Sequence, residues 1–449
     1  MHYLPNDPVA EEMLGKMGLS SMEDLFTDIP EDMRVKRLDL PPGISEVELV
    51  RTVDKMMKES RGAGDMPMFL GCGFYDHFIP SAVEYVMSRS ELYTSYTPYQ
   101  PEMSQGILQA LFEYQSMMSD ILKMDVVNTS MYDYHTAIGE AILMAKRMNH
   151  RNVFLLPEIM AREKFQVVEN YIRGAGIETR TVPFKDGTMD LDALKGMLTG
   201  EVSGVYIENP NILGLFDKGA MEIRSIMESR QVLVVGVNPM TLSIAKPPGD
   251  YGADIVVGDV QPLGVPISYG GPTAGIFAVS MKNVRKMPGR IIGATKDAEG
   301  RRAFAMTLST REQHIRRERA TSNICTNEAL TSIMASAYLA SLGKGGFREL
   351  GLQLASRGRY LAGRIDELEG FRAPAFAGHF FNEFPVSVDV SVSGLLKECR
   401  NRGVLAGYDL SRETDLLEGT FTVATTEMHT NADYEKLLEV LVKSREVLL

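Results

Sequence analysis

The chain lacks several features that mark whole classes of protein. No apolar run is long enough to cross a bilayer, and residues 1–5 do not begin a basic segment followed by an apolar stretch. We therefore expect neither a membrane span nor a signal peptide. The three cysteines, Cys72, Cys325 and Cys399, are odd in number and far apart, which fits neither a disulfide framework nor a zinc knuckle. We interpret them as buried structural thiols in a protein of the reducing cytoplasm.

Positive charge is outweighed, since 47 lysines and arginines face 59 aspartates and glutamates and the net charge is −12. This argues against nucleic acid as a partner, since a phosphate backbone attracts clustered lysine and arginine. The basic cluster at 311–319 is interrupted by Glu312 and Glu318, which is typical of a solvated or interface helix. The histidines His77, His135 and His314 are isolated, so we expect hydrogen-bonded structural histidines and no metal site.

The middle of the chain alternates between short apolar runs and helical patterns. A length of 449 residues allows two or three domains with substantial cores. Short apolar runs suit strands that are buried on both faces, and we predict strands at 153–156, 179–182, 205–207, 232–237, 255–257 and 276–279. Between several of them we predict helices at 158–173, at 191–198 with Asp190 as N-cap, and at 221–228. This order predicts a parallel sheet with right-handed crossovers, whose strand ends, such as 208–210, are where ligands bind.

The two ends of the chain differ from the middle. Residues 1–58 consist of short helical patterns broken by Pro30, Pro41 and Pro42, which predicts an arm that packs on another surface. We assign 59–325 to a large α/β domain, and 326–449 to a small C-terminal α+β domain with its linking helix at 326–369. Within the last part we predict a strand at 386–392 entered through Pro385, a helix at 395–402, a strand at 421–424 and a terminal helix.

Five segments carry a resemblance to a known family. The most specific is TREQHIRRERATSNICTN at 310–327; the others are FLGCGFY at 69–75, YTSYTPYQPEMSQG at 93–106, NTSMYD at 128–133 and SYGGPTAG at 268–275. They resemble blocks of the glycine cleavage system P-proteins, the decarboxylating glycine dehydrogenases. More narrowly, they resemble the separate first subunit of the two-chain members. Together they extend over most of the chain.

The resemblance implies a fold, a reaction and partners. The fold is that of type I pyridoxal-phosphate enzymes, with a large α/β domain, a small terminal domain and an N-terminal arm. In the implied reaction, glycine forms an aldimine with the cofactor and loses its carboxylate as CO2, and the aminomethyl group passes to the lipoyl arm of the H-protein. The implied assembly is an α2β2 heterotetramer with the second subunit.

The residues depart from this chemistry at two places. A pyridoxal enzyme needs a Schiff-base lysine and an acid that pairs with the pyridinium nitrogen. The stretch 258–266, where this fold places the lysine, contains none, and the strand end at 234–239 has no carboxylate. We interpret Asp254 as a strand-entry residue and Asp259 as a turn residue. We therefore expect no pyridoxal phosphate in this chain, in keeping with a first subunit whose cofactor sits on the partner.

The tyrosine-rich segment is the candidate contribution to catalysis. Tyr93, Tyr96 and Tyr99 recur every three residues, but Pro98 and Pro101 exclude a regular helix there. We predict a loop that presents phenols and the carboxylate of Glu102 to a ligand, while burial in an ordinary subunit contact is the alternative. In the family, the matching loop reaches the active site at the subunit interface. The glycines at 270–275 either cradle a phosphate or form a tight turn before the next strand.

Three functional hypotheses follow. The first is a subunit without cofactor that completes an active site in a two-chain enzyme. The second is an autonomous pyridoxal-phosphate enzyme that uses a displaced lysine, such as Lys282 or Lys296. The third is a scaffold or regulatory subunit that never contacts substrate. The tyrosine loop separates the first hypothesis from the third, and Schiff-base absorbance of the isolated chain separates the first from the second.

Overall fold

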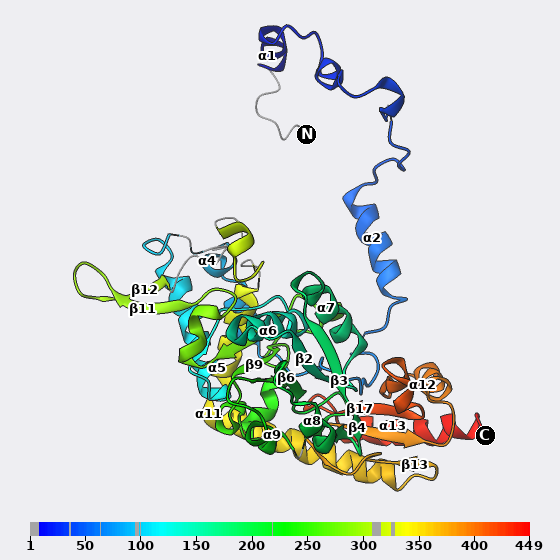
Figure 1. Ribbon diagram of the computed structural model, residues 1–449. Coiled ribbons are helices and arrows are strands. Elements are labelled where there is room, and N and C mark those ends of the chain that lie inside the picture. The colour runs from blue at the N-terminus through cyan, green and yellow to red at the C-terminus, as the bar shows by residue number, and fades with distance from the viewer. Residues whose placement is uncertain are drawn as a thin grey trace. The chain divides into compact units, whose positions relative to one another are not determined.

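The computed structural model describes residues 9–35, 37–62, 64–94, 98, 100–217, 219–307, 316–324 and 328–449. The chain divides into two compact units, Met1–Arg61 and Gly62–Leu449 (Figure 1). In the described part of the first unit, the helices are α1 (Ala10–Lys16), η2 (Met22–Phe26), η3 (Glu31–Met33) and α2 (Glu46–Met57). Leu14 is the only buried residue among the described residues of this unit, so it has almost no core of its own.

The second unit is built on a seven-stranded mixed sheet with the order β1-β10-β9-β8-β6-β2-β3. Its strands are β1 (Val126–Val127), β2 (Val153–Pro157), β3 (Glu178–Val182), β6 (Val202–Glu208), β8 (Val232–Val237), β9 (Ile255–Asp259) and β10 (Gly275–Val279). The strands from β3 to β9 are parallel, whereas β10 and β1 are antiparallel to their neighbours. All six predicted strands are present and the predicted α/β architecture is confirmed, but the strand at 276–279 runs antiparallel, so the sheet is mixed and not wholly parallel.

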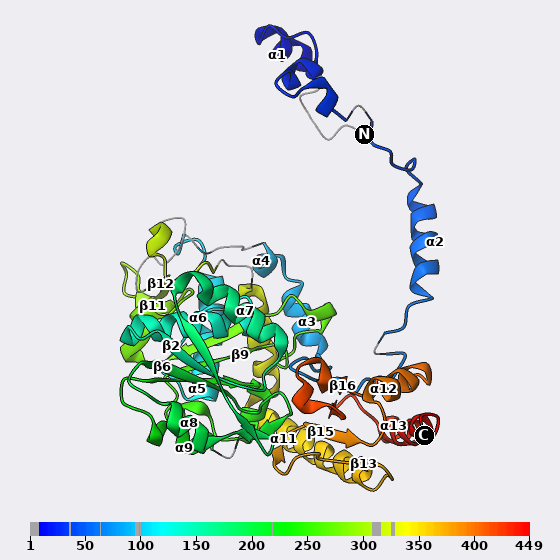
Figure 2. The ribbon, with the colours of Figure 1, turned by 45° about the vertical axis from the view of Figure 1, so that its right-hand side comes forward.

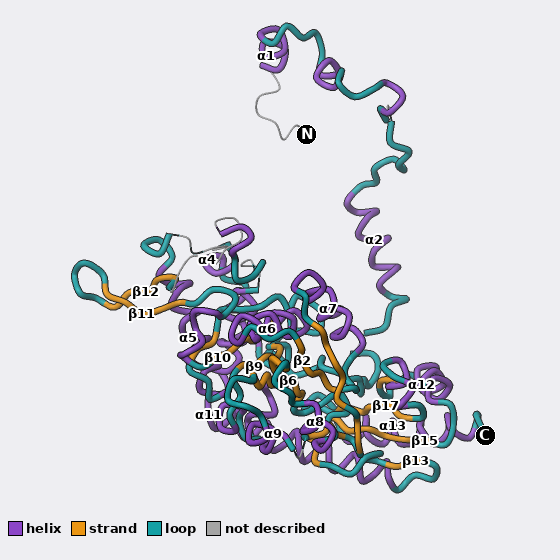
Figure 3. The backbone as a smooth tube through the Cα atoms, viewed as in Figure 1, coloured by secondary structure: helices purple, strands orange, loops and turns teal. Residues whose placement is uncertain are grey.

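Helices cover both faces of this sheet (Figure 3). On one face, α6 and α7 pack through residues such as Ala137 and Val168 against Phe154 and Tyr206. The opposite face packs against another group of helices, which includes α5 and α11. The helices of this part are α3 (Ser81–Met87), α4 (Ser90–Tyr93), α5 (Gln105–Leu122), α6 (Tyr134–Asn149), α7 (Arg162–Ile172), α8 (Leu191–Met197), α9 (Ala220–Ile226) and α11 (Ala329–Asp366). Short 3-10 turns lie between these elements: η4 (Arg173–Ala175), η5 (Pro239–Ser243), η6 (Pro248–Tyr251), η7 (Ser268–Gly270), η8 (Met281–Lys286) and η9 (Arg317–Arg319).

Local signals explain several of these boundaries. Asp190 caps α8 as predicted, because its side chain accepts hydrogen bonds from the amides of Asp192 and Ala193. The helix predicted at 158–173 begins later, at Arg162. The long helix predicted at 326–369 is present as α11, but Gly343 breaks it with a φ of 60°. A residue with a positive φ cannot continue a right-handed helix, and glycine adopts a positive φ at little cost.

A four-stranded sheet with the order β13-β15-β17-β16 forms the core of the C-terminal part. Figure 2 shows it beside α12 and α13. Its elements are β13 (Phe371–Arg372), β15 (Glu383–Val388), α12 (Val392–Asn401), β16 (Tyr408–Asp409), η10 (Leu410–Arg412), η11 (Asp415–Leu417), β17 (Thr420–Ala424) and α13 (Asn431–Glu446). Small two-stranded pairs complete the unit: β4 (Phe184–Lys185) with β5 (Thr188–Met189), β7 (Leu215–Phe216) with β14 (His379–Phe380), and β11 (Ile292–Lys296) with β12 (Arg302–Met306).

The strand predicted at 386–392 was placed too late. The observed strand β15 starts at Glu383 and has Pro385 inside it. Proline has no amide hydrogen to donate, but the ladder with β13 includes only Ser387 and Val388 of this strand, so no donor is needed there. The Pro385 carbonyl accepts from the Ala375 amide at 2.7 Å. Ser391 then caps α12 by accepting from the amide of Gly394, so Val392 is the first residue of a helix and not the last residue of a strand.

Helix α6 carries a buried carboxyl group that makes the stability of the fold pH-dependent. Glu140 is 3% exposed, and its Oε2 atom has no hydrogen-bond partner and lies 4.0 Å from Arg147 Nη2. Burial raises the pKa of Glu140 to about 7, against the opposing effect of Arg147. A pKa that is higher in the folded chain destabilises the fold wherever the group is ionised. The penalty is absent below pH 4.5, grows towards pH 7 and is complete above it.

We therefore expect Glu140→Gln to stabilise the chain at pH 8 by roughly 1–3 kcal/mol and to lose this advantage as the pH falls towards 4.5. The measurement is urea unfolding of the isolated chain at several pH values. The control is Glu169→Gln, the same change at an exposed position of α7, which we expect to alter stability by no more than about 0.5 kcal/mol. A Glu140→Gln chain that is equally destabilised at all pH values would show that the carboxylate is well paired.

Candidate functional site

The carboxyl ends of the parallel strands border one cavity, which we call the edge cavity. Its outer part encloses about 420 Å³ and contains residues from α6, α7 and the loop after Leu70. The inner recess is lined by Cys72, Gly73, Tyr75, Tyr134, Ala161, Lys164, Glu208, Pro210, Asn211, Ile212, Val237, Asn238, Pro239, Asp259, Pro262 and Glu383. This is the place where open α/β sheets bind ligands, and the predicted strand end at 208–210 lies within it.

The N-terminus of α6 opens into the edge cavity. Asp133 is the N-cap, and its side chain accepts a hydrogen bond from the Thr136 amide at 2.8 Å. The Thr136 hydroxyl accepts in return from the Asp133 amide at 3.2 Å, which completes a capping box. A negative side chain therefore occupies the positive end of this helix.

Lys164 of α7 reaches into the cavity and is held there by an ion pair. Its Nζ atom lies 2.6 Å from Glu208 Oε1, and both side chains are largely buried. The same ammonium lies 4.1 Å from the centre of the Tyr134 ring. The Tyr206 hydroxyl donates to Glu208 Oε1 at 2.8 Å, so this carboxylate is satisfied from two sides.

Asp259 is the last residue of β9 and faces the cavity, so its interpretation as a turn residue was wrong. Its side chain accepts hydrogen bonds from the Thr273 hydroxyl and, at 2.8 Å, from the Gln261 amide. Burial raises the pKa of Asp259 to about 7, and the hydrogen bonds from Thr273, Gln261 and the Tyr134 backbone oppose this rise. Asp254, by contrast, precedes β9 as predicted and pairs with Arg224 at 3.0 Å.

The opposite wall of the recess comes from the C-terminal part. Glu383 of β15 is buried, and its two oxygens accept from the Tyr75 hydroxyl at 2.6 Å and the Cys72 amide at 2.8 Å. Gly71 lies so close that a Cβ atom there would be 2.2 Å from Glu383 Oε1. Burial raises the pKa of Glu383, while the Tyr75 hydrogen bond lowers it.

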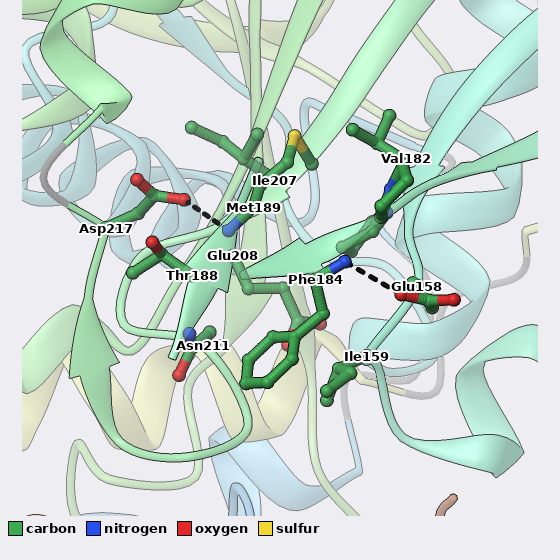
Figure 4. A pocket seen from close by; sticks show the side chains of 12 residues that line it. Glu158, Ile159, Val182, Phe184, Thr188, Met189, Ile207, Glu208, Asn211 and Asp217 are labelled. Atoms are coloured by element: carbon green, nitrogen blue, oxygen red, sulfur yellow. Dashed lines mark hydrogen bonds between the residues drawn. The ribbon is translucent and has the colours of Figure 1, made fainter. Parts of the chain in front are cut away.

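A smaller hollow beside the edge cavity has a structural role. Figure 4 shows Glu158 and Asp217 on either side of it. Glu158 accepts from the Phe184 amide at 2.7 Å, and Asp217 accepts from the Gly219 amide at 2.8 Å. Both carboxylates thus hold backbone segments, including the β4–β5 turn.

The glycine-rich turn at 270–275 borders the outer cavity through Gly270 and Thr273. Its amides are used within the fold: Gly270 donates to Ile267 at 2.8 Å, Gly271 to Ser268 at 3.2 Å and Gly275 to Met131 at 3.0 Å. This arrangement fits the tight-turn interpretation better than a phosphate cradle.

Of the predicted tyrosine segment, the described site residues are Tyr93 and Glu102, and they lie outside the edge cavity. Tyr93 is the last residue of the short helix α4 and is 70% exposed. Glu102 is exposed in the turn before α5, which begins at Gln105 with Ser104 as its N-cap. Neither lines the edge cavity. Tyr96 and Tyr99 are outside the described residues.

The remaining single residues have ordinary roles. His77 is buried and its Nδ1 atom lies 2.9 Å from Glu427 Oε2, as expected of a structural histidine. His135 is half-buried, 3.8 Å from Asp133 Oδ1. Cys399 is buried and Cys72 is partly buried, both as free thiols, and burial raises both pKa values. His314 and Cys325 are outside the described residues.

Sequence reasoning missed three of the groups that shape the cavity: Lys164, Gln261 and Glu383. Lys164 is one of several polar residues on an amphipathic helix, and nothing local separates it from its neighbours. Glu383 lies more than 300 residues from Tyr75, so only the tertiary fold brings them together. In the part of the chain that the structure describes, no cluster of potential metal ligands is present and no helix is long and apolar enough to cross a membrane.

Comparison with known proteins gives a consistent result. The family model for the glycine cleavage system P-protein matches residues 1–441. A curated relative from Thermococcus kodakarensis, named probable glycine dehydrogenase (decarboxylating) subunit 1, is 46% identical over 95% of this chain and 94% of its own length. A protein of the same name from Listeria monocytogenes is 41% identical over 98% of both chains.

Solved structures agree with the sequence relatives. A crystal structure of glycine decarboxylase (P-protein) of the glycine cleavage system, in inhibitor-bound form, is 36% identical, with a TM-score of 0.88 over 99% of this chain and 100% of that chain. A sphingosine-1-phosphate lyase from Burkholderia pseudomallei, 12% identical with a TM-score of 0.63 over 93% of this chain and 94% of that chain, shares the fold alone. The chain therefore belongs to the glycine cleavage system P-protein family.

Proposed function

We propose that this chain is the first subunit of a two-chain glycine dehydrogenase (decarboxylating) and carries no cofactor itself. With a second subunit it removes the carboxylate of glycine as CO2 and passes the aminomethyl group to the lipoyl arm of the H-protein. The name shared by its relatives, subunit 1, supports a second chain as partner. The α2β2 stoichiometry, the H-protein and a cytoplasmic location belong to the same proposal.

The lining of the edge cavity carries the proposal about the cofactor. Pyridoxal phosphate needs a free lysine for its aldehyde and an acid for its ring nitrogen. Pro262 stands at the cavity in the stretch after β9 where the fold places that lysine. Asn238, which follows β8, uses its side-chain oxygen to accept the Met240 amide at 3.0 Å. The residues present do not fit the cofactor, which supports its assignment to the partner subunit.

The displaced lysines of the second hypothesis also lie outside the cavity. Lys282 is exposed and approaches Asp254, the residue before β9, to 3.7 Å, so it is near the opposite end of that strand. Lys296 is exposed in the β11–β12 hairpin. Lys164 does line the cavity, but its ammonium is bonded to Glu208. Each observation counts against an autonomous pyridoxal-phosphate enzyme.

The exposure of Tyr93 and Glu102 supports a role at the subunit interface. Phenols present an apolar surface and one directed hydroxyl, which suits a site that must exclude water around a small substrate. We propose that one or two of Tyr93, Tyr96 and Tyr99 face the partner's active site, while the others anchor the segment. Glu102 would orient a hydroxyl or the substrate ammonium.

The proposal predicts where a reduced cofactor is found. Borohydride treatment of the assembled complex, followed by peptide mapping, should place the phosphopyridoxyl group on a lysine of the partner and on no lysine of this chain. The isolated chain should take up none under the same conditions. A phosphopyridoxyl-lysine at Lys164, Lys282, Lys296 or any other position of this chain would favour the autonomous enzyme instead.

A further inference from the structure

The edge cavity contains the feature that most often binds phosphate in α/β proteins, the N-terminus of a long helix. Helix α6 has 16 residues, and Asp133, Tyr134 and His135 at its start line the cavity. The first amides of a helix have no partner within the helix, and the helix dipole makes this end attractive to anions. What these amides contact therefore determines whether a phosphate can bind.

One carboxylate of the chain already contacts them, and a second lies beside them. The Asp133 side chain accepts from the Thr136 amide at 2.8 Å. Asp259, at the end of strand β9, lines the same cavity as Asp133 and Tyr134, the N-cap and first residue of the helix. Both carboxyl groups are held in place. Asp133 is held by its capping box, and Asp259 by hydrogen bonds from Thr273 and Gln261. Carboxyl groups of the chain itself therefore already offset the positive N-terminal end of the α6 dipole.

The cavity offers no free cation to outweigh these charges. Among the described lining residues, Lys164 is the one permanently charged cation, and Glu208 neutralises it at 2.6 Å. Glu163 and Glu413 add further negative charge at the outer rim. A phosphate that approached α6 would meet carboxylates at the position where it needs donors.

From this arrangement we infer that Asp133 excludes phosphate from the N-terminus of α6, and thereby excludes phosphorylated cofactors from this chain independently of the missing lysine. The inference rests on the proposed function for the choice of ligand, since it concerns why the cofactor stays on the partner. A lysine introduced at Pro262 alone would therefore not create a cofactor site, because Asp133 would still exclude the phosphate group of the cofactor.

The test is isothermal titration of the isolated full-length chain with inorganic phosphate at pH 8, above the pKa of about 7 of Asp259. Asp133→Ser removes the charge and keeps a good N-cap, so the helix should remain intact. We expect no saturable binding by the wild type and an affinity at least about tenfold higher for Asp133→Ser. Asp133→Asn serves as a second variant of nearly unchanged shape. Asp190→Ser, the same change at the N-cap of α8, should gain nothing because Asp190 does not line the edge cavity.

The outcomes separate this inference from the proposed function. Saturable phosphate binding by the wild type that is lost on Asp133→Ser would overturn the inference, while the cofactor would still lack a lysine in this chain. If neither Asp133 variant gains affinity although circular dichroism shows both are folded, Asp133 is not the barrier and the inference fails. A phosphopyridoxyl-lysine in the wild-type chain would instead refute the proposed function.

Discussion

Deletion of residues 1–61 is expected to weaken assembly with the second subunit by at least about 100-fold and to abolish activity at micromolar concentration. The unit exposes many large apolar side chains: Val9, Met13, Met17, Met22, Leu25, Phe26, Ile29, Met33, Val35, Leu38, Leu40, Ile44, Val47, Leu49, Val50, Val53, Met56 and Met57. Burying four of them against a partner would stabilise the complex by roughly 6–12 kcal/mol, before the cost of association is subtracted. Analytical ultracentrifugation of the reconstituted complex measures the loss.

A matched pair of point variants tests whether assembly depends on the apolar face of α2 or only on the presence of residues 1–61. Helix α2 has a capping box at Ser45 and Glu48 and no buried residue, so it is formed locally and presents its apolar side outward. Val50→Glu places a charge on the apolar face with Leu49 and Val53, whereas Arg51→Glu places a negative charge on the opposite side. We expect only Val50→Glu to weaken assembly. Unchanged affinity of the truncated chain would show that the arm does not dock.

Loss of a single hydroxyl from the tyrosine segment is expected to slow catalysis by one to two decades without disturbing assembly. Tyr→Phe at Tyr93, Tyr96 or Tyr99 removes one directed hydrogen bond and keeps the ring. A hydrogen bond used in the transition state contributes roughly 1.5–3 kcal/mol, which corresponds to this change in rate. We expect the effect at one or two of the three tyrosines, and a comparable effect for Glu102→Gln.

Exchange of labelled bicarbonate into glycine by the reconstituted complex measures the chemical step. The control is Tyr360→Phe, an exposed tyrosine of α11 whose hydroxyl only accepts from Arg364 at 2.8 Å. Sedimentation must show that each variant assembles normally. Wild-type exchange rates in all four loop variants would make the segment an interface alone, and the scaffold hypothesis would become the better account of this chain.

The sequence predicted the sheet well because the relevant signal is local. A buried parallel strand is a short apolar run between polar ends, and the prediction of 232–237 coincides with β8. Asp190 was found for the same reason, since an N-cap acts on amides two and three residues away. The two-chain function came from the family resemblance, supported by the absence of a lysine after β9.

Features that depend on distant contacts were missed or misplaced. The Val-Ser-Val alternation after Pro385 predicts a strand, but pairing with β17 begins at Glu383 and the cap at Ser391 ends it early. Asp259 was assigned to a turn because nothing nearby in sequence shows that the Thr273 hydroxyl approaches its carboxyl group. The ion pair of Lys164 with Glu208 joins a helix to a strand 44 residues away.

The contacts of Tyr75 have a mechanical consequence for the chain. Its hydroxyl is bonded to Glu383 of the four-stranded sheet, while its amide and carbonyl are bonded to the side chain of Gln261 beside the seven-stranded sheet, each at 2.9 Å. All of these groups are buried. Rotating one sheet against the other would break either the hydrogen bond to Glu383 or the two to Gln261, and would leave buried polar atoms unpaired. These bonds therefore oppose a change in the width of the edge cavity, and we expect closing motions during the catalytic cycle to occur mainly in other parts of the enzyme.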